Sequence, residues 1–268
     1  MNRHRISFTT AALGAGLAFL YAPLLVVMVN SFNASRLVTV WTGFSPRWYG
    51  ELFADRQILD AALNSLIVAV CSASLAVVVG TTAGYVFARF GYFRGRAALS
   101  GALAAPLVLP DVIAGLSLLL MFVALEQTFT WLPGRGLLTI VLAHASFTTA
   151  YVAIIVQARL AGMDREAEES AADLGAKPFA VFRAITLPMI RPAVAAGWLL
   201  AFVLSLDDLV IASFVSGPQS TTLPMVVFSS VRLGVSPKIN ALATILIVVT
   251  LALLSVAAWM GRATLKQK

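Results

Sequence analysis

The sequence predicts an all-α integral membrane protein with six transmembrane helices. Of its 268 residues, 60% are hydrophobic and only 12% are charged, whereas soluble domains carry about 25% charged residues. Six stretches are long and apolar enough to cross a bilayer, which takes roughly 20 residues in a helix. Because these runs are continuously apolar, helices are favoured over the alternating strands of a membrane barrel.

The six predicted spans form one membrane domain covering residues 1–268. Their bounds are 7–29, 61–87, 97–125, 137–157, 193–215 and 239–260. The first span follows Arg3 and Arg5 and is longer than the core of a signal peptide, which runs about 7–15 residues, so we interpret it as uncleaved. Cys71 is the single cysteine of the chain, which excludes an internal disulfide.

Charge placement predicts the orientation of the spans. The formal net charge is +7, and the basic residues lie in short loops between apolar runs. This placement favours a role in setting topology over nucleic-acid binding. With the N-terminus inside, only six of the 19 Lys and Arg residues fall in outer loops: Arg36, Arg47, Arg56, Arg135, Arg232 and Lys238. Both termini are therefore expected to face the cytoplasm.

The outer loops carry their own signals. Trp41, Trp48 and Tyr49 are residue types that suit a membrane–water interface. The apolar run 223–228 is too short to span and predicts a helix lying at the outer surface. Ser236–Pro237 predicts the start of the sixth span, as an N-cap followed by proline at the first helical position.

The inner loop between the fourth and fifth spans predicts a helix–turn–helix. Asp164 can cap a first helix, and Gly175 stands where that helix would end in a left-handed residue. Pro178 can open a second helix, which Pro188 and Pro192 are expected to close. Phe179, Phe182 and Ile185 then share one apolar face, which we expect to dock into a partner's groove. The alternative is a solvated loop whose amphipathicity is incidental.

This loop, residues 158–192, resembles the cytoplasmic signature of permease subunits from binding-protein-dependent ABC importers. The signature is Glu-Ala-Ala, three residues, Gly, nine residues and Ile-x-Leu-Pro. The matching residues are Glu169, Ser170, Ala171, Gly175, Ile185, Leu187 and Pro188. The one departure is Ser170 in place of alanine, a small residue replacing a small residue. We call residues 158–192 the coupling loop.

The resemblance implies the type I importer permease fold, with a five-helix core and one extra N-terminal span. It implies a multi-pass subunit of the bacterial inner membrane, paired with a second homologous permease as a heterodimer. It also implies a dimer of ATPase subunits, whose cleft receives the coupling loop, and a periplasmic solute-binding protein. The chain has no G-x-x-x-x-G-K-[ST] stretch. We therefore expect no enzyme activity and no bound cofactor here, with ATP and Mg used by the partner ATPase.

Three carboxylates lie inside predicted spans, where charge is costly and usually functional. Asp111 and Asp207 are each 14 residues beyond the inner ends of their spans, roughly 21 Å from the cytoplasmic face. His144 is expected at nearly the same level, and a layer of negative charge there suits a cation. Asp208 and Asp207 diverge by about 100° on a helix, so one can line the path while the other bonds across a helix interface.

Other interpretations of these groups remain open. The acids can be buried hydrogen-bonding groups that hold helices or the partner subunit, and His144 can be structural. Pro106 and Pro110 flank the same level and free backbone carbonyls, as in the broken helices of transporters. The spans contain no plausible nucleophile–base set or metal cluster, which argues against an intramembrane enzyme.

The substrate is indicated by a second resemblance. Residues 205–245 are similar to polyamine importer permeases, and most similar to the putrescine branch. A diammonium substrate suits carboxylates in a path of low dielectric constant. The alternatives are spermidine, another organic solute or cation, and a self-sufficient secondary transporter in which Asp111, Asp207 or Asp208 carries protons.

Overall fold

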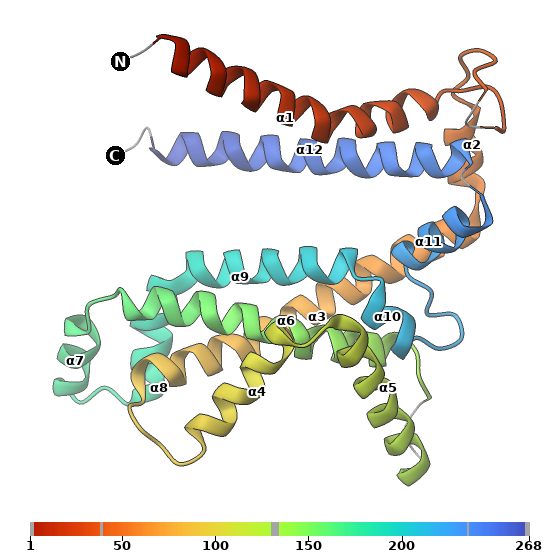
Figure 1. Ribbon diagram of the computed structural model, residues 1–268. Coiled ribbons are helices and arrows are strands. Elements are labelled where there is room, and N and C mark those ends of the chain that lie inside the picture. Colours follow the sequence, from red (N-terminus) through yellow and green to blue (C-terminus); the bar gives the residue numbers. More distant parts are fainter. Residues whose placement is uncertain (1–2, 38–39, 130–133, 235, 266–268) are drawn as a thin grey trace. The chain divides into compact units, whose positions relative to one another are not determined.

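The computed structural model describes residues 3–37, 40–129, 134–234 and 236–265, with side chains described from residue 8 to residue 251 of these ranges. Within these ranges the chain is helical apart from loops and one isolated bridge, Asn33 to Phe44. Figure 1 labels the helices α1 (Arg3–Asn30), α2 (Arg47–Ala54), α3 (Arg56–Arg89), α4 (Arg96–Val108), α5 (Asp111–Thr128), α6 (Leu137–Ala161), α7 (Glu166–Asp173), α8 (Pro178–Val181), α9 (Leu187–Asp207), α10 (Val210–Val215), α11 (Leu223–Leu233) and α12 (Pro237–Leu265), with a π-helical turn, η1 (Phe182–Thr186), between α8 and α9.

Five helical segments of the described chain are long and apolar enough to cross a membrane. They are Phe8–Asn30, Arg56–Arg89, Asp111–Thr128, Leu137–Ala161 and Pro178–Asp207. The sixth predicted span, 239–260, lies within α12, whose side chains are described up to Leu251. Residues 1–2 and 266–268 lie outside the described residues, and Lys266 and Lys268 among them contribute to the predicted orientation.

Two predicted spans are not the continuous helices that we expected. The span 97–125 is broken between α4 and α5 at Leu109 and Pro110, because Pro110 has no N–H to donate to the turn before it. The span 193–215 is broken at Asp208 and Leu209, between α9 and α10. Each break lies beside an intramembrane acid that the sequence had singled out.

The chain divides into two compact units, one formed by residues 1–59 with 227–268 and the other by residues 60–226. In the first unit, α12 packs against α1 and α2. The loop after α1 is organised by the buried Asn33, whose carboxamide accepts from the N–H groups of Ser35 and Thr42 and donates to the carbonyl of Val40. Trp48 Nε1 donates to the carbonyl of Asn33 at 2.6 Å.

Trp48 is therefore a buried residue of this loop, and its place at the membrane–water interface stays a prediction. Its side chain is only 4% exposed, because its indole N–H and ring are both used to close this loop. The other two aromatic residues differ from it: Trp41 is exposed, and Tyr49 is half-buried with its hydroxyl 2.8 Å from Ser31 Oγ. The helix predicted from 223 is present as α11, and the sixth span begins at Pro237 as predicted.

A charged clasp joins the start of α12 to the start of α3 in this unit. Lys238 Nζ lies 2.5 Å from Asp55 Oδ2. The hydrogen bond from Lys238, followed by those from the N–H groups of Ile58 and Gln57, holds the pKa of Asp55 below its ordinary value. A lowered carboxyl pKa stabilises the fold above the unfolded pKa of about 3.9, and the effect is lost as the pH falls through the lower folded value. The clasp is thus intact throughout the neutral range.

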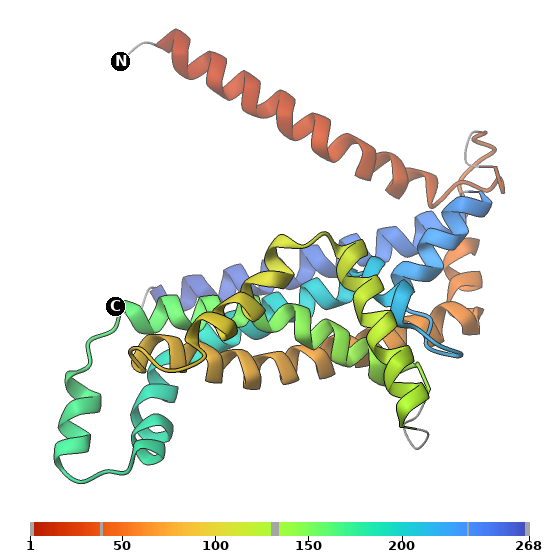
Figure 2. The same cartoon turned by 60° about the horizontal axis from the view of Figure 1, so that its bottom comes forward.

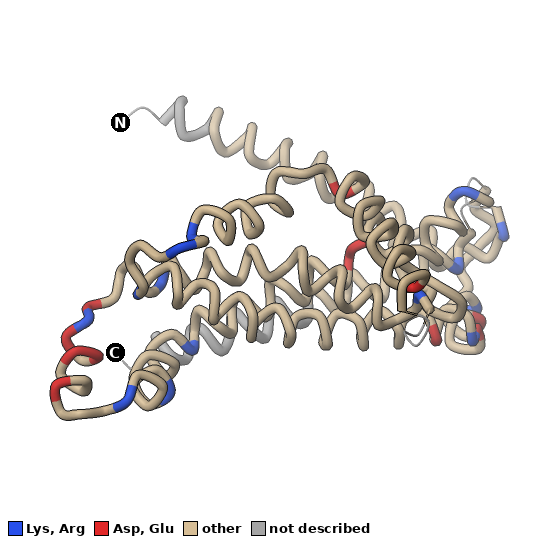
Figure 3. Tube along the Cα trace, turned by 90° about the horizontal axis from the view of Figure 1, so that it is seen from below, with Lys and Arg blue, Asp and Glu red and all other residues tan. Residues whose placement is uncertain are grey.

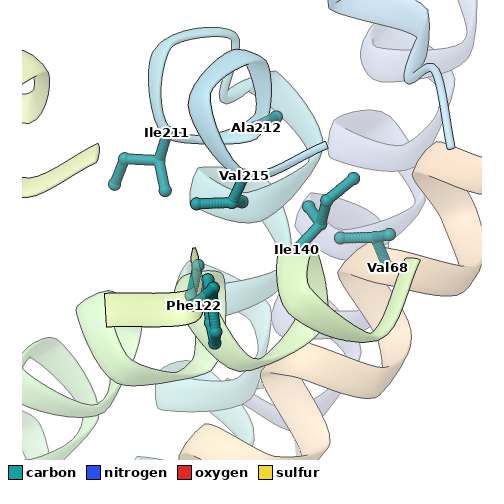
Figure 4. Close-up of a cluster of buried hydrophobic side chains, with 7 residues drawn as sticks. Val68, Phe122, Ile140, Ile211, Ala212 and Val215 are labelled. Carbon is teal, nitrogen blue, oxygen red and sulfur yellow. The ribbon is translucent and has the colours of Figure 1, made fainter. Parts of the chain in front are cut away.

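The second unit is built around α6, which is the most buried of its long helices. At one end, α6 packs with α5, α10 and α3 around the cluster in Figure 4, where Val68, Phe122, Ile140, Ile211 and Val215 gather. At the other end, Val152, Val156 and Leu160 of α6 pack against α3 and α9. The two clusters hold α6 against the helices that carry the acids and the coupling loop.

Glycines allow α3 to approach α6 closely. A Cβ on Gly84 would lie 2.7 Å from the carbonyl oxygen of Ala153, and a Cβ on Gly80 would lie 2.7 Å from Val152 Cβ. These distances are shorter than real contacts, so a methyl group would force the two backbones apart. Small residues on α3 thus allow close packing against α6.

We predict that Gly84→Ala destabilises the folded subunit by about 1–3 kcal/mol through overpacking. Gly101→Ala is the matched control, because a Cβ on Gly101 meets no atom within 4 Å. Thermal unfolding in detergent should show a lower midpoint for Gly84→Ala alone. Equal midpoints for the two variants would contradict the close approach of α3 to α6.

Candidate functional site

The first half of the coupling loop folds as its sequence predicts. Asp164 Oδ1 accepts the N–H of Glu166 at 3.1 Å, at the start of α7. Gly175 has a φ of +87°, and its N–H donates to Ala172 O at 2.9 Å. The N–H of Ala176 reaches back to Ala171 O at 3.0 Å. These two bonds form the Schellman closure of a helix, which requires a left-handed residue at the glycine.

The second half departs from the prediction. Pro178 opens α8 as expected, but Pro188 and Pro192 do not close the helix. Instead, α8 continues through η1 into α9, so that one helical segment runs from Pro178 to Asp207. The π-helical turn makes this possible, because the N–H of Leu187 bonds to Phe182 O, five residues back. An extra residue in the turn relieves the clash that Pro188 would otherwise make with the preceding turn.

The loop presents an apolar surface smaller than the predicted one. Phe182 is half-buried and meets Tyr85 edge-on at 4.9 Å between ring centroids, and Ile185 is also half-buried. Only Phe179 of the predicted face remains exposed, at 73%, joined by Leu174 at 90%. Figure 2 shows this stretch, green to teal, as a hairpin beyond the ends of α6 and α9. Leu174 was missed because its exposure depends on how α7 is turned.

The signature residues occupy two environments within the loop. Glu169 and Ser170 lie exposed on α7, and Gly175 is exposed in the turn after it. The other four residues are half-buried: Ala171, Ile185, Leu187 and Pro188. Figure 3 shows acidic and basic residues gathered around this end of the unit, while the helices between their ends carry few charges.

At the other end of α9, Asp208 and His144 meet. His144 Nε2 lies 3.1 Å from Asp208 Oδ1, and the His144 and Asp208 side chains are only 2% and 13% exposed. His144 Nδ1 lies 2.7 Å from Ser205 Oγ, which accepts a hydrogen bond from Ser72 at 2.9 Å. If Ser72 donates to Ser205 and Ser205 donates to His144 Nδ1, then Nδ1 is the acceptor. The imidazole proton is then assigned to Nε2, which faces the carboxylate of Asp208.

Asp208 also accepts a backbone hydrogen bond at the start of α10. Its Oδ1 accepts the N–H of Ala212 at 2.9 Å, in the first turn of α10. The carboxylate therefore satisfies a backbone donor that the helix break has freed. Its two partners come from α6 and α10, so Asp208 is the acid that bonds across a helix interface.

Asp207 and Asp111 are placed differently. Asp207 is the last residue of α9, and Asp111 is the first residue of α5, directly after the break at Pro110. Both side chains are exposed, and neither forms a hydrogen bond or ion pair with another residue in the described part of the chain. A carboxylate at the first turn of a helix is favoured by the helix dipole. Asp111 and Asp207 thus differ from Asp208 in being exposed and unpaired within the described residues.

The two breaks belong to elements that pack together. α10 lies against α5, where a Cβ on Gly115 would come within 2.6 Å of the Phe214 ring. Of the acids that the sequence predicts at the level of His144, the structure brings Asp208 into contact with it, whereas Asp111 does not take part in that contact. Within the residues described, no group of three His, Cys, Asp or Glu side chains could hold a metal ion.

The family of this chain is shown by its sequence. The family model described as "Binding-protein-dependent transport system inner membrane component" matches residues 76–264. The chain belongs to this family. As a member of this inner-membrane transport family, it is a multi-pass membrane subunit, and its coupling loop lies within the matched range.

Curated relatives of the permease are similar over most of its length. It is 60% identical over 232 residues to the putrescine transport system permease protein PotI of Escherichia coli, covering 87% of this chain and 83% of that one. It is 42% identical over 236 residues to the spermidine/putrescine permease protein PotC of the same organism, covering 88% and 87%. These relatives are permease proteins of transport systems.

Solved structures establish the fold of the permease. One chain of a bacterial ABC transporter that imports the acidic polysaccharide alginate superposes with a TM-score of 0.74, at 15% identity, over 98% of both chains. The inward-facing methionine transporter MetNI gives a TM-score of 0.60 at 16% identity, over 77% of this chain and 95% of that one. The fold is that of type I ABC importer permeases, as predicted.

The stability of two variants tests whether Asp208, and not its neighbour Asp207, is the acid that holds the structure together. Asp208→Ala removes the carboxylate beside His144 Nε2 and leaves the N–H of Ala212 without its acceptor, so we expect a loss of about 1–3 kcal/mol in unfolding free energy. Asp207→Ala removes an exposed carboxylate and should leave stability within about 0.5 kcal/mol of the wild-type permease. Thermal unfolding in detergent measures both. Equal losses would show that Asp208 is not the structural member.

Proposed function

We propose that this permease is the membrane subunit of an ATP-driven polyamine importer, with putrescine as its favoured substrate. The observation that carries the proposal is the 60% identity to a putrescine transport permease over 87% of the chain. The unpaired carboxylates Asp111 and Asp207 at the two helix breaks agree with a cationic substrate. The spermidine/putrescine relative, at 42% identity, is more distant.

The chemistry of the path follows from this placement. Putrescine carries two ammonium groups, and an ammonium is held by carboxylates and freed backbone carbonyls in a region of low dielectric constant. Asp208 is engaged by His144 and by α10, so Asp111 and Asp207 are the acids available to the cation. His144 then acts indirectly, by fixing Asp208 and the end of α9.

The remaining parts of the importer follow from the family. A binding protein delivers the solute from the periplasm, and a second homologous permease completes the path as a heterodimer. An ATPase dimer binds ATP and Mg and receives the coupling loop, since this chain has no phosphate-binding loop of its own. Both termini face the cytoplasm in this arrangement. A self-sufficient proton-coupled transporter is disfavoured, because it would leave the coupling loop without a role.

ATP-dependent uptake by the complete importer in proteoliposomes tests the substrate. We expect putrescine to be taken up faster than spermidine, and an unrelated amine not at all. Asp111→Asn and Asp207→Asn should each reduce putrescine uptake about tenfold or more, because a hydrogen bond to a charged group contributes about 1.5–3 kcal/mol. The control is Asp60→Asn, an exposed acid distant in sequence from both breaks. Faster uptake of the unrelated amine than of putrescine would contradict the proposed substrate.

A pair of variants at Gly175 tests the coupling loop. Gly175→Val places a β-branched residue at φ +87°, which opposes the left-handed turn between α7 and α8. Gly175→Asn keeps the turn, because asparagine tolerates this conformation. We expect the valine variant to insert in the membrane but to lose co-purification with the ATPase, and the asparagine variant to retain it. Retention by both would contradict docking through this loop.

A further inference from the structure

A buried ion pair joins the coupling loop to the end of α3. Arg89, the last residue of α3, places Nε 2.7 Å from Glu168 Oε2, and its side chain is 8% exposed against 12% for Glu168. Arg89 Nη1 also donates to Leu160 O at 3.1 Å, near the end of α6. Pairs on the surface contribute little, but this pair is largely withdrawn from water and its cation has a second partner.

The same carboxylate holds the π-helical turn. Thr186 Oγ1 donates to Glu168 Oε1 at 2.7 Å, and Thr186 is fully buried. Glu168 therefore links α7 to α3 and α6 through Arg89, and to the start of α9 through Thr186. We call Arg89, Glu168 and Thr186 the latch.

None of the latch residues is one that the family signature specifies, since Thr186 fills its unspecified position between Ile185 and Leu187. Glu168 precedes the signature residue Glu169, and neighbours on a helix point about 100° apart. Glu168 is accordingly turned toward the bundle, whereas Glu169 is exposed. Helix α7 thus presents one face for a partner and keeps a different face tied to the permease.

The latch holds the π-helical turn at the start of α9. A π-helical turn holds one residue more than an α-helical turn and is often found at functional sites. Thr186 is the last residue of this turn, and α9 leads from it to Asp207 and the break at Asp208. Glu168 therefore connects α7 to the start of α9 through Thr186, and to α3 through Arg89.

We propose that the latch transmits displacement of α7 to α9 and α3, and that Arg89, Glu168 and Thr186 are positioning residues that touch neither solute nor nucleotide. This rests on the proposed function, in which an ATPase moves α7. The latch explains why docking at the exposed face of α7 changes the helices behind it. Breaking the latch should leave docking of the ATPase on α7 intact, but the helices behind α7 should no longer respond to docking.

Hydrogen–deuterium exchange on the whole importer, with and without ATP and vanadate, separates docking from transmission. In wild type we expect nucleotide to change exchange in both α7 and residues 182–190. In Glu168→Gln and Thr186→Val, the change in α7 should persist, while the change in 182–190 falls about tenfold, a typical size for coupling between sites. The number of putrescine molecules imported per ATP should fall by a similar factor.

Three control variants sharpen the result. Thr186→Ser keeps the hydroxyl and should behave as wild type, and Glu166→Gln alters an exposed acid on the same helix outside the latch. Because Glu168 is the partner of both Arg89 and Thr186, Glu168→Gln already breaks both contacts, and adding Arg89→Gln should make it no worse.

Two outcomes would contradict the proposed role of the latch. If the nucleotide-dependent change in exchange of residues 182–190 survives in Glu168→Gln and Thr186→Val, transmission does not pass through the latch. If the response of α7 is lost as well, Glu168 serves docking and not transmission. Neither readout by exchange depends on the solute. Failure of wild-type importer to take up putrescine would therefore reject the proposed substrate and leave the test of the latch standing.

Discussion

One constraint underlies the site: thirty residues from Pro178 to Asp207 form a single helical segment. At 1.5 Å per residue this segment is roughly 45 Å long, more than the thickness of the hydrocarbon core. Two prolines would normally interrupt it, and the π-helical turn removes the conflict at Pro188. The second half of the coupling loop and the break at Asp208 consequently lie at the two ends of one continuous helical segment.

The carboxylates fall into two groups, paired and unpaired, because a charge withdrawn from water needs a partner. Asp208 is enclosed by His144 and the first turn of α10, and Glu168 is enclosed by Arg89 and Thr186. Each of these acids ties a helix end to its neighbours. Asp111 and Asp207 have no such partners in the described chain, which leaves their charge for something the chain itself does not supply. A paired acid, Asp208, and an exposed acid, Asp207, therefore stand side by side at the second break.

Sequence reasoning found the coupling loop because local rules decide most of it. The turn that Asp164 makes before α7, the left-handed Gly175 and the helix start at Pro178 depend on a few neighbouring residues. It misjudged the end of the second helix, since proline is normally a helix stop and a π-helical turn has no simple sequence pattern. It also missed Arg89 and Glu168, which lie 79 residues apart and meet only because α3 and α7 pack together.

The sequence by itself determined the class, the family and the approximate spans of this protein, because hydrophobic length and loop motifs are properties of short segments. It also identified the intramembrane acids as unusual. Only the tertiary structure decided which acid is paired, where spans three and five break and which loop side chains remain exposed. Those outcomes depend on distances between helices far apart in the chain, and a linear pattern of residues does not encode these distances in any readable form.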